Sequence, residues 1–239
     1  MVEIKFCPST LAEGYNTYSP QAVKRLFDGK RVSPFLDFNI NELKQSDVIV
    51  RAMQRISVSG VQEKFSGLID QNSILKYSGC YEDIAKCIRK TIPAWIVDME
   101  RFFELVVFNY IYANGDDHLK NFSVIRQGSD YRLAPAYDLL NTSLHVIGDD
   151  FGLDGGLSPD IEKSDVYDRT GHPCRLDFER FGAQIGLADS RIKRVLNKYM
   201  VIPELTMKLV GNSYLNDKMK RKYLRIVDER VKRFVRKSE

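Results

Sequence analysis

WIVDMERFFELVVFNYIYANGDDHLKNFSVIRQGSDYRLAPAYD occupies residues 95–138 and decides the fold. Its first part, Trp95 to Tyr112, carries apolar residues on nearly every helical face, which predicts a helix buried on most sides. Asn114-Gly115 should end that helix, since glycine is favoured just past a helix end. Phe122–Arg126 and Tyr131–Ala134 then flank a Gln-Gly-Ser-Asp turn, as two strands of a hairpin would. The stretch therefore predicts a buried helix, a polar loop and a β-hairpin in succession.

The segments on either side complete an α+β pattern. Before the stretch, residues 54–70 are typical of a strand, a small-residue turn and a second strand. After it, residues 141–175 are rich in Gly, Asp and Pro, which favours a loop. Helices are expected over Pro20–Phe27, Ile40–Leu43, residues 81–90, Leu176–Ile185, Arg191–Tyr199, Pro203–Val210 and Asp217–Lys237. We therefore expect segregated elements, with a strand-rich N-terminal lobe at 1–80 and a helical lobe at 81–239.

Composition is typical of a soluble globular protein. Of the 239 residues, 44% are hydrophobic and 28% are charged, and 13 Phe with 12 Tyr argue against disorder. The net charge of +4 fits an anionic ligand such as a nucleotide, or a nucleic acid, without choosing between them. The four cysteines form no CxxC pair, so no zinc or redox motif is signalled. Since no signal peptide and no uncharged membrane-length run is visible, we expect a soluble, cytoplasmic protein.

The densest polar cluster follows the predicted helix and suggests a catalytic loop. Asp116 and Asn121 are five positions apart, the interval between the catalytic Asp and the metal-binding Asn of the protein-kinase motif HRDxxxxN. Asp138 follows the predicted hairpin, where kinases place a second metal-binding Asp. One carboxylate near the nucleophile and hard oxygen ligands for Mg²⁺ suit phosphoryl transfer. Each residue alone is explained as well by a turn or a cap, so it is their order along the chain that favours a site.

Two further sets of residues are candidates for nucleotide contact. In the same loop, Lys120 is within reach of a transferring phosphate, whereas His118 is expected to orient the loop through a hydrogen bond. A turn of small residues between two predicted strands would let backbone N–H groups approach phosphates; it consists of Ser57, Val58, Ser59, Gly60, Val61 and Gln62. A plain hairpin is the simpler explanation of that turn, because one glycine does not make a glycine-rich loop.

Three stretches resemble the HipA family of bacterial toxin kinases. They are ISVSGVQEK at 56–64, NGDDHLKNFS at 114–123 and LAPAYDLLNT at 133–142, within a similarity that covers residues from about 54 to 200. The resemblance implies a protein-kinase-like, two-lobed fold that uses ATP and Mg²⁺ to phosphorylate a serine or threonine of a protein. In the family that protein is an aminoacyl-tRNA synthetase. The implied partner is a helix-turn-helix antitoxin, and DNA would be contacted only through it.

The roles that the resemblance implies fall on matching residues. Asp116 would be the catalytic base, and Asn121 and Asp138 would be the Mg²⁺ ligands. His118 and Lys120 would lie near the nucleotide.

The same resemblance assigns a role to the small-residue turn. Ser57 to Gln62 would cover the phosphates of ATP. In the family a serine of this loop is autophosphorylated, which ejects the loop and silences the kinase. Ser57 matches that serine best, and Ser59 is a second candidate, as in the family's shorter, split (HipT-like) members. A phosphate there would add roughly two negative charges where the ATP phosphates must lie.

The chain departs from the family between the first and second motifs. Kinases need a lysine on a strand after the glycine-rich loop, yet few residues separate Lys64 from the helix expected at 81–90. The join lies near Ile74–Tyr77, where Lys76 is awkwardly placed to be that lysine. Either residues are missing there or the protein is a pseudokinase that binds an antitoxin; a small-molecule or lipid kinase of related fold is a further alternative. An N-terminal subdomain of the family also lacks a counterpart, so we expect a small separate partner protein to supply it.

The C-terminal segment is basic. Asp217 to Glu239 contains ten Lys or Arg against four acidic residues. Its apolar residues recur at helical spacing, which predicts an amphipathic helix with a solvated basic face; they are Met219, Tyr223, Ile226, Val227, Val231 and Phe234. The alternative is contact with DNA phosphates or with an acidic partner in a repressor complex.

Overall fold

The structure, a computed structural model, describes residues 4–34, 63–64, 78–146 and 148–236. Contacts divide the chain into two compact units, the first comprising Met1–Gly60 with Glu204–Lys220 and the second Val61–Pro203 with Arg221–Glu239. The helix expected at Ile40–Leu43 and most of the strands expected at 54–70 lie outside the described residues. The strand-rich lobe at 1–80 and the two-lobed, kinase-like organisation therefore stay predictions.

The first unit joins two distant parts of the sequence. Its helix α1, Pro20–Leu26, begins as expected from sequence, because Ser19 Oγ accepts the N–H of Ala22 at 3.2 Å. Helix α10, Glu204–Asn212, belongs to the same unit. The hydroxyl of Tyr214, just past α10, donates to the carbonyl of Phe6 at 2.6 Å. The unit is thus closed by a contact between residues more than two hundred positions apart.

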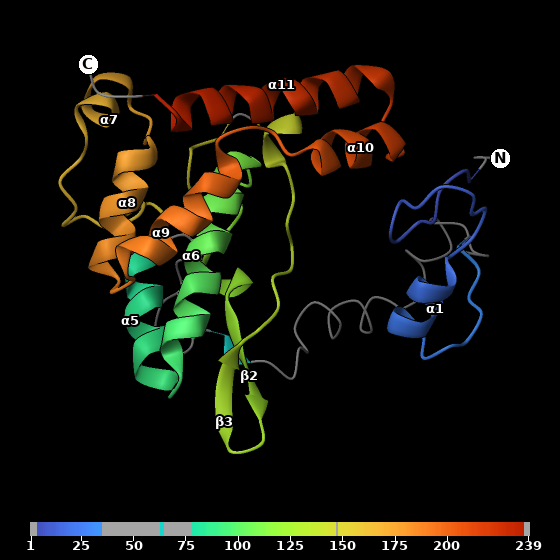
Figure 1. Ribbon diagram of the computed structural model, residues 1–239, viewed down its shortest axis with the longest axis horizontal. Coiled ribbons are helices and arrows are strands. Elements are labelled where there is room, and N and C mark those ends of the chain that lie inside the picture. The colour runs from blue at the N-terminus through green and yellow to red at the C-terminus, as the bar shows by residue number, and fades with distance from the viewer. Residues whose placement is uncertain (1–3, 35–62, 65–77, 147, 237–239) are drawn as a thin grey trace, which may run out of the picture. The chain divides into compact units, whose positions relative to one another are not determined.

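The second unit is mainly helical and contains one small sheet (Figure 1). Its elements are β1 (Glu63–Lys64), α5 (Tyr81–Thr91), α6 (Trp95–Ile111), η1 (Leu119–Asn121), β2 (Ser123–Gln127), β3 (Asp130–Leu133), η2 (Thr142–Leu144), α7 (Asp165–Thr170), α8 (Arg175–Gln184), α9 (Asp189–Leu196) and η3 (Asn197–Tyr199). Helix α11, Asp217–Phe234, begins in the first unit and continues into the second. This mixture confirms the predicted α+β class. None of the helices in the described ranges is long and apolar enough to cross a membrane.

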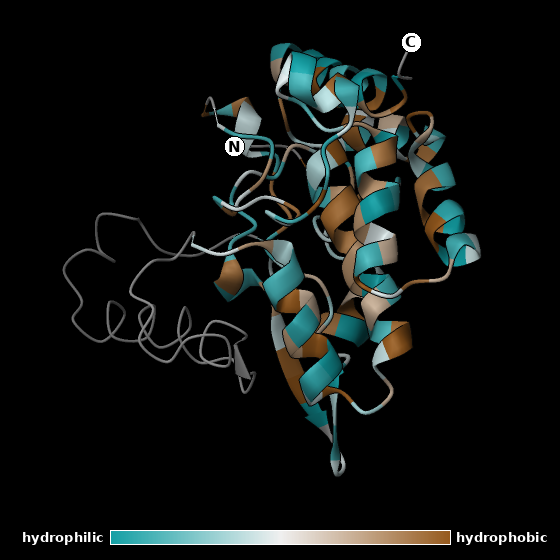
Figure 2. Cartoon of the chain, turned by 90° about the vertical axis from the view of Figure 1, so that its left-hand side faces the viewer, coloured by the Kyte–Doolittle hydropathy of each residue, from teal (hydrophilic) through white to brown (hydrophobic). Residues whose placement is uncertain are grey.

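Helix α6 lies at the centre of the second unit. It packs against α5 and α9, and its buried residues include Met99, Phe102, Phe103, Val106, Val107, Tyr110 and Ile111. The prediction of a helix buried on most sides is confirmed. In Figure 2 the helices carry both brown, apolar faces and teal, polar faces, as expected for helices that share one core.

The end of α6 differs in detail from the sequence prediction. The residue with left-handed backbone is Ala113, at φ +55°, rather than Gly115. The N–H of Ala113 donates to the carbonyl of Tyr110 at 3.2 Å, and the N–H of Asn114 donates to that of Asn109 at 2.8 Å. These two bonds form a Schellman motif, which satisfies the last carbonyls of the helix and offsets the strain of a non-glycine residue there.

The hairpin expected after the polar loop is confirmed, with β2 shifted by one residue. β2 pairs antiparallel with β3, from Val124 opposite Leu133 to Gln127 opposite Asp130. Phe122, expected to begin the strand, instead follows the 3-10 turn η1 and is buried in the core. β1 pairs antiparallel with the other edge of β2, which gives the sheet order β1-β2-β3.

A buried carboxylate ties the hairpin to α6. Asp98, fully buried on α6, accepts the backbone N–H of Leu133 on β3 at 3.3 Å. Arg101 Nη1 lies 3.3 Å and Arg132 Nη1 lies 3.7 Å from its two oxygens. The hairpin is therefore held on α6 by polar as well as apolar contacts.

The remaining helices differ from expectation mainly in one place. Residues 141–175 were expected to be loop, but α7 forms within them at Asp165–Thr170. Ser164 caps its start, its Oγ accepting the N–H of Tyr167, and Gly171 ends it with φ +71°. Only six residues lie between these signals, so the helix is too short for a hydrophobic period to appear in the sequence.

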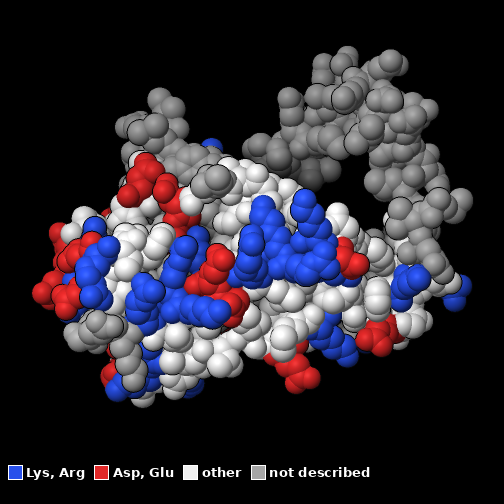
Figure 3. Space-filling view, turned by 90° about the horizontal axis from the view of Figure 1, so that it is seen from above, with Lys and Arg blue, Asp and Glu red and all other residues white. Residues whose placement is uncertain are grey.

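Helix α11 is amphipathic, as the apolar spacing of the sequence predicts. Val227, Val231 and Phe234 are buried, whereas Lys and Arg side chains with interspersed acidic residues cover the surface seen from above (Figure 3). The helix ends at Phe234, three residues before the predicted Lys237. Arg230, a charged residue, is buried on the same face, which the apolar spacing did not predict.

Candidate active site

The loop after α6 is anchored by Asn114. Its side-chain amide donates to the Asn109 side chain at 3.2 Å and to the backbone carbonyl of Asp138 at 3.2 Å. Its side-chain oxygen accepts the N–H of Asp116 at 3.3 Å. Asn114 is itself buried, so it joins the start of the loop to the segment that carries Asp138.

Asp116 and Asn121 are brought together, as their spacing predicts. The side-chain amide of Asn121 donates to the backbone carbonyl of Asp116 at 2.7 Å, which closes the loop. With its nitrogen used in this way, the amide oxygen of Asn121 is the atom suited to a ligand role. The Asp116 side chain is 38% exposed, so its carboxylate can meet a substrate.

His118 lies inside the loop and has the orienting role expected for it. The residue is buried, and its Nδ1 accepts the N–H of Lys120 at 3.2 Å. The acceptor role of Nδ1 assigns the proton of the neutral ring to Nε2, which lies 3.9 Å from Asp116 Oδ1. That distance is too long for a hydrogen bond. Lys120 itself is exposed.

The segment 137–142 packs along the loop. The Tyr137 hydroxyl donates to the carbonyl of Lys120 at 2.9 Å, and Thr142 Oγ1 accepts the N–H of Gly115 at 2.9 Å. Thr142 also returns two bonds to the carbonyl of Ala113, from its N–H at 3.1 Å and its hydroxyl at 3.2 Å. The second and third motifs of the sequence are therefore joined along their length.

Asp138 has a strained backbone and an exposed side chain. Its φ of +57° lies in the left-handed region, which Asp tolerates better than most residues but still at some cost. Its carbonyl is fixed by Asn114, and its carboxylate is left at the surface. Such strain is found most often at functional sites.

The donor set at this place fits magnesium. Asp138 offers a carboxylate and Asn121 an amide oxygen, and Mg²⁺ in phosphoryl-transfer sites takes one or two such protein ligands together with substrate phosphates. Among the residues that the structure describes, no group of three or more His, Cys, Asp or Glu side chains could hold a metal.

The predicted phosphate-covering turn, Ser57 to Gln62, lies outside the described residues. The residues that follow it are described: Glu63 pairs with Val124 and Lys64 with Ser123. Since Ser123 is two positions after Asn121, Lys64 lies close to the end of the polar loop.

A buried polar cluster beneath the loop was not predicted from sequence. Asp117 Oδ2 accepts from Asn109 Nδ2 at 3.0 Å, and Asp117 Oδ1 accepts the N–H of Gly152 at 2.9 Å. The Tyr81 hydroxyl on α5 also hydrogen-bonds this carboxylate. Burial raises the pKa of Asp117 to about 7, although these three hydrogen bonds oppose the shift. Asn109, a polar residue among apolar ones in the last turn of α6, was the one signal of the cluster in the sequence.

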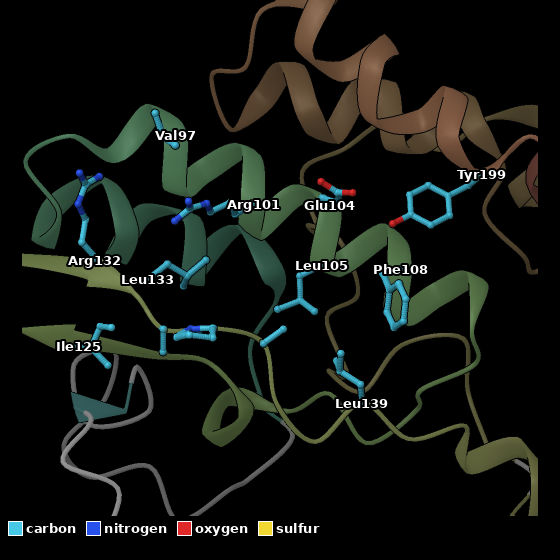
Figure 4. Close-up of a pocket in the computed structure, with 13 residues that line it drawn as sticks. Val97, Arg101, Glu104, Leu105, Phe108, Ile125, Arg132, Leu133, Leu139 and Tyr199 are labelled. Atoms are coloured by element: carbon cyan, nitrogen blue, oxygen red, sulfur yellow. The ribbon is translucent and has the colours of Figure 1, made fainter. Parts of the chain in front are cut away.

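A pocket of about 730 Å³ opens between α6 and the hairpin (Figure 4). Leu105, Phe108 and Ile125 give it an apolar wall, and its lining reaches Ala136 and Leu139 on either side of Asp138. Asp116, Asn121 and Asp138 are not among the described residues that line it. We therefore do not assign the nucleotide to this pocket.

Comparison with known proteins matches most of the chain to a family of known description. A family model described as the HipA-like C-terminal domain matches residues 30–204, well over half of the sequence. Curated relatives match shorter stretches. A Sinorhizobium fredii protein named "Putative kinase Y4dM" is 45% identical over 56 residues, 22% of this chain and 13% of that protein. A Haemophilus influenzae protein named "Putative kinase" is 36% identical over 64 residues, 26% of this chain and 19% of that protein.

The chain thus spans less than a fifth of each of these two relatives. Among solved structures, a Shewanella oneidensis complex of HipA, HipB and operator DNA matches with a TM-score of 0.46 and 14% identity. That match covers 65% of this chain and 36% of the matched one. The family-model match includes all three sequence motifs, and the chain belongs to the family of HipA-like C-terminal domains.

Proposed function

We propose that this protein is a HipA-like toxin kinase that transfers the γ-phosphoryl group of ATP to a serine or threonine of a protein. The observation that supports the proposal is a pair of hydrogen bonds that connect the loop to Asp138 and close the loop on itself. Asn121 donates to the carbonyl of Asp116, and Asn114 donates to the carbonyl of Asp138. The names of the two relatives support the coarser part of the proposal, a kinase, over the short stretches that they match.

In the proposed reaction, Asp116 accepts the proton of the attacking hydroxyl while the new O–P bond forms and ADP leaves. Asn121 and Asp138 would hold Mg²⁺, which when bound would neutralise charge on the phosphates. His118 fixes the backbone of the loop at Lys120, so that Asp116 and Asn121 keep their spacing. The Lys120 side chain, exposed beside them, would meet the nucleotide phosphates.

Substrate and partners follow from family membership. We propose an aminoacyl-tRNA synthetase as substrate and autophosphorylation at Ser57 or Ser59. A HipB-like helix-turn-helix antitoxin would bind the protein and mediate any contact with DNA, and a small separate protein would supply the N-terminal subdomain. These steps occur in the cytoplasm.

The test is incubation of the purified protein with γ-labelled ATP, Mg²⁺ and a bacterial lysate, beside the Asp116→Ala variant. We expect label on one protein band of synthetase size, reduced on the order of 10²- to 10⁴-fold by the substitution. Label on a small metabolite alone would favour a small-molecule kinase. Absence of label with both proteins would favour a pseudokinase, the alternative suggested by the small number of residues between Lys64 and α5.

A further inference from the structure

Asp117 directly follows the proposed catalytic base, but its side chain is buried instead of facing substrate. The residue is 2% exposed. Its carboxylate receives hydrogen bonds from three separate parts of the unit: Asn109 on α6, Tyr81 on α5, and the backbone N–H of Gly152. The Asp117 side chain thus connects the loop to α5, to α6 and to the chain segment around Gly152.

The contact with Gly152 is close enough to exclude water and any larger residue. A Cβ on Gly152 would lie 2.5 Å from Asp117 Oδ1 and 2.6 Å from the Asp117 nitrogen. The N–H of Gly152 also points to the Tyr81 hydroxyl at 3.2 Å, so the three groups form one network. The ring of the preceding Phe151 packs at 5.7 Å from that of Tyr81, which holds the segment in place.

The chemistry of this network is unusual for a purely structural residue. All three donors are neutral, so no cation compensates the charge that Asp117 carries when ionised, and Tyr81 is the one titratable group hydrogen-bonded to it. Burial raises the Asp117 pKa to about 7, and burial together with the Asp117 charge raises the pKa of Tyr81 well above its usual value. Ionised Asp117 therefore lowers the stability of the fold, a cost that is common where a carboxylate serves a functional site.

We propose that the ionised carboxylate of Asp117 is the positioning group that holds Asp116 in the geometry needed for proton transfer. It acts by accepting the Asn109, Tyr81 and Gly152 hydrogen bonds at once. This inference rests on the proposed kinase function. Protonation removes the negative charge of Asp117 and turns one of its oxygens into a donor, so the hydrogen bonds donated to it are weakened and the loop is held less tightly.

The consequence is an opposite dependence of activity and stability on pH. As the pH rises through about 7, Asp117 ionises, the loop is fixed, and turnover rises. Stability falls at lower pH, between about pH 4 and 7, because in that range the folded state holds a proton that the unfolded state has lost. A residue with only a structural role would have no reason to raise turnover when it takes up the charge that weakens the fold.

The test compares wild type, Asp117→Asn and a matched control, Asp177→Asn, as full chains. Asp177 is also buried and also accepts three neutral hydrogen bonds, two from Ser164 at 2.7 Å and one from the Cys174 N–H at 2.8 Å, but it lies outside the loop network. The rate of γ-phosphoryl transfer to the protein that becomes labelled is measured over a range of MgATP concentrations up to saturation, between pH 5.5 and 8.5, which spans about 1.5 units on either side of the Asp117 pKa.

We expect Asp117→Asn to lower kcat about 10- to 100-fold and to remove an inflection near pH 7, with the KM for ATP within about threefold of wild type. Asp177→Asn should keep both kcat and the inflection even if its Tm falls. Equal losses in the two variants, or an unchanged inflection in Asp117→Asn, would overturn the proposal.

A second measurement separates this proposal from the kinase function itself. Hydrogen exchange of the peptide that contains residues 114–121 should be about tenfold faster in Asp117→Asn than in Asp177→Asn at pH 8. If wild type transfers no phosphate, the proposed function fails, and exchange alone then decides whether Asp117 positions the loop. Equal exchange in the two variants would refute the positioning role.

Discussion

Gly152 is the residue whose substitution should disturb the site most directly. The 2.5 Å approach of its missing Cβ to Asp117 leaves no room for even a methyl group. We expect Gly152→Ala to destabilise the protein by about 1–3 kcal/mol, as in other overpacked positions, measured by urea unfolding. Gly211→Ala is the control, because nothing lies within 4 Å of that Cβ position. A Gly152→Ala protein as stable as the control would contradict the packing described.

Asp117 should also leave a signature in the pH dependence of stability. Its folded-state pKa of about 7 lies above the usual Asp value of about 3.9, so the folded state holds the proton more tightly. The stability that this proton contributes is present below about pH 4 and is lost as the pH rises through about 7. Urea unfolding should therefore show wild type losing stability relative to Asp117→Asn between pH 4 and 7. A constant difference across that range would show that Asp117 titrates with an ordinary pKa.

At the residue scale, the spacing of polar residues in the sequence was enough to select candidate site residues. It did not reveal the residues whose role depends on hydrogen-bond partners far along the chain. The interval from Asp116 to Asn121 suggested that they act together. The side chain of Asn121 does bond the backbone carbonyl of Asp116, and their joint role in catalysis stays a prediction. The anchoring roles of Asn114 and Asp117 were not predictable, although both lie in the same polar stretch. Their partners are 24 and 35 positions away, at Asp138 and Gly152, and a single sequence shows no sign of such pairings.

At the scale of elements, Asp98 joins helix α6 to the hairpin that carries the chain to Asp138. Asp98→Ala would leave the N–H of Leu133 without its buried acceptor. We expect the free energy of unfolding to fall by about 1–3 kcal/mol as a result. The urea midpoint should fall accordingly. Asp130→Ala, on the exposed turn of the same hairpin, should change stability by less than about 0.5 kcal/mol. Similar effects of the two substitutions would remove Asp98 from this role.

Elements with strong local signals were predictable, whereas short ones were not. Helix α6 and the β2–β3 hairpin were expected from an apolar stretch and a glycine-containing turn, and both are present. Helix α7 was missed because six residues cannot show a period. The end of α6 was predicted at Asn114-Gly115, since preference for glycine was the only local guide. The left-handed residue is Ala113, and the Schellman bonds that stabilise it appear only in three dimensions.

At the scale of the second unit, helix α11 is tied to the segment that contains Gly152. Arg230, which is 7% exposed, pairs with the carboxylate of Asp150, and His172 Nδ1 lies 2.7 Å from the same group. Arg230 also lies over the ring of Tyr110, with 5.1 Å between its guanidinium carbon and the ring centroid. The C-terminal helix therefore supports the segment beneath the catalytic loop, a link that the basic composition of α11 did not reveal.

Breaking this pair should be costly. In Arg230→Met, Asp150 keeps His172 and the more distant Arg233 as partners. We therefore expect the free energy of unfolding to fall by about 2–4 kcal/mol, somewhat less than for a buried charge that has lost every partner. Arg225→Met is the control, since Arg225 is 71% exposed and its pair with Glu229 spans 3.9 Å. Thermal unfolding that shifts by the same amount in both variants would argue against the link.

The central claim is that Asn121 and Asp138 hold the metal of a bound nucleotide next to Asp116. It is tested most directly by electron paramagnetic resonance titration of Mn²⁺ in the presence of ATP, with Mn²⁺ replacing Mg²⁺. We predict that Asn121→Ala and Asp138→Ala each weaken protein-bound Mn²⁺ by about tenfold or more, whereas Asp116→Ala binds it as wild type does. Equal Mn²⁺ binding by wild type and all three variants would contradict the account.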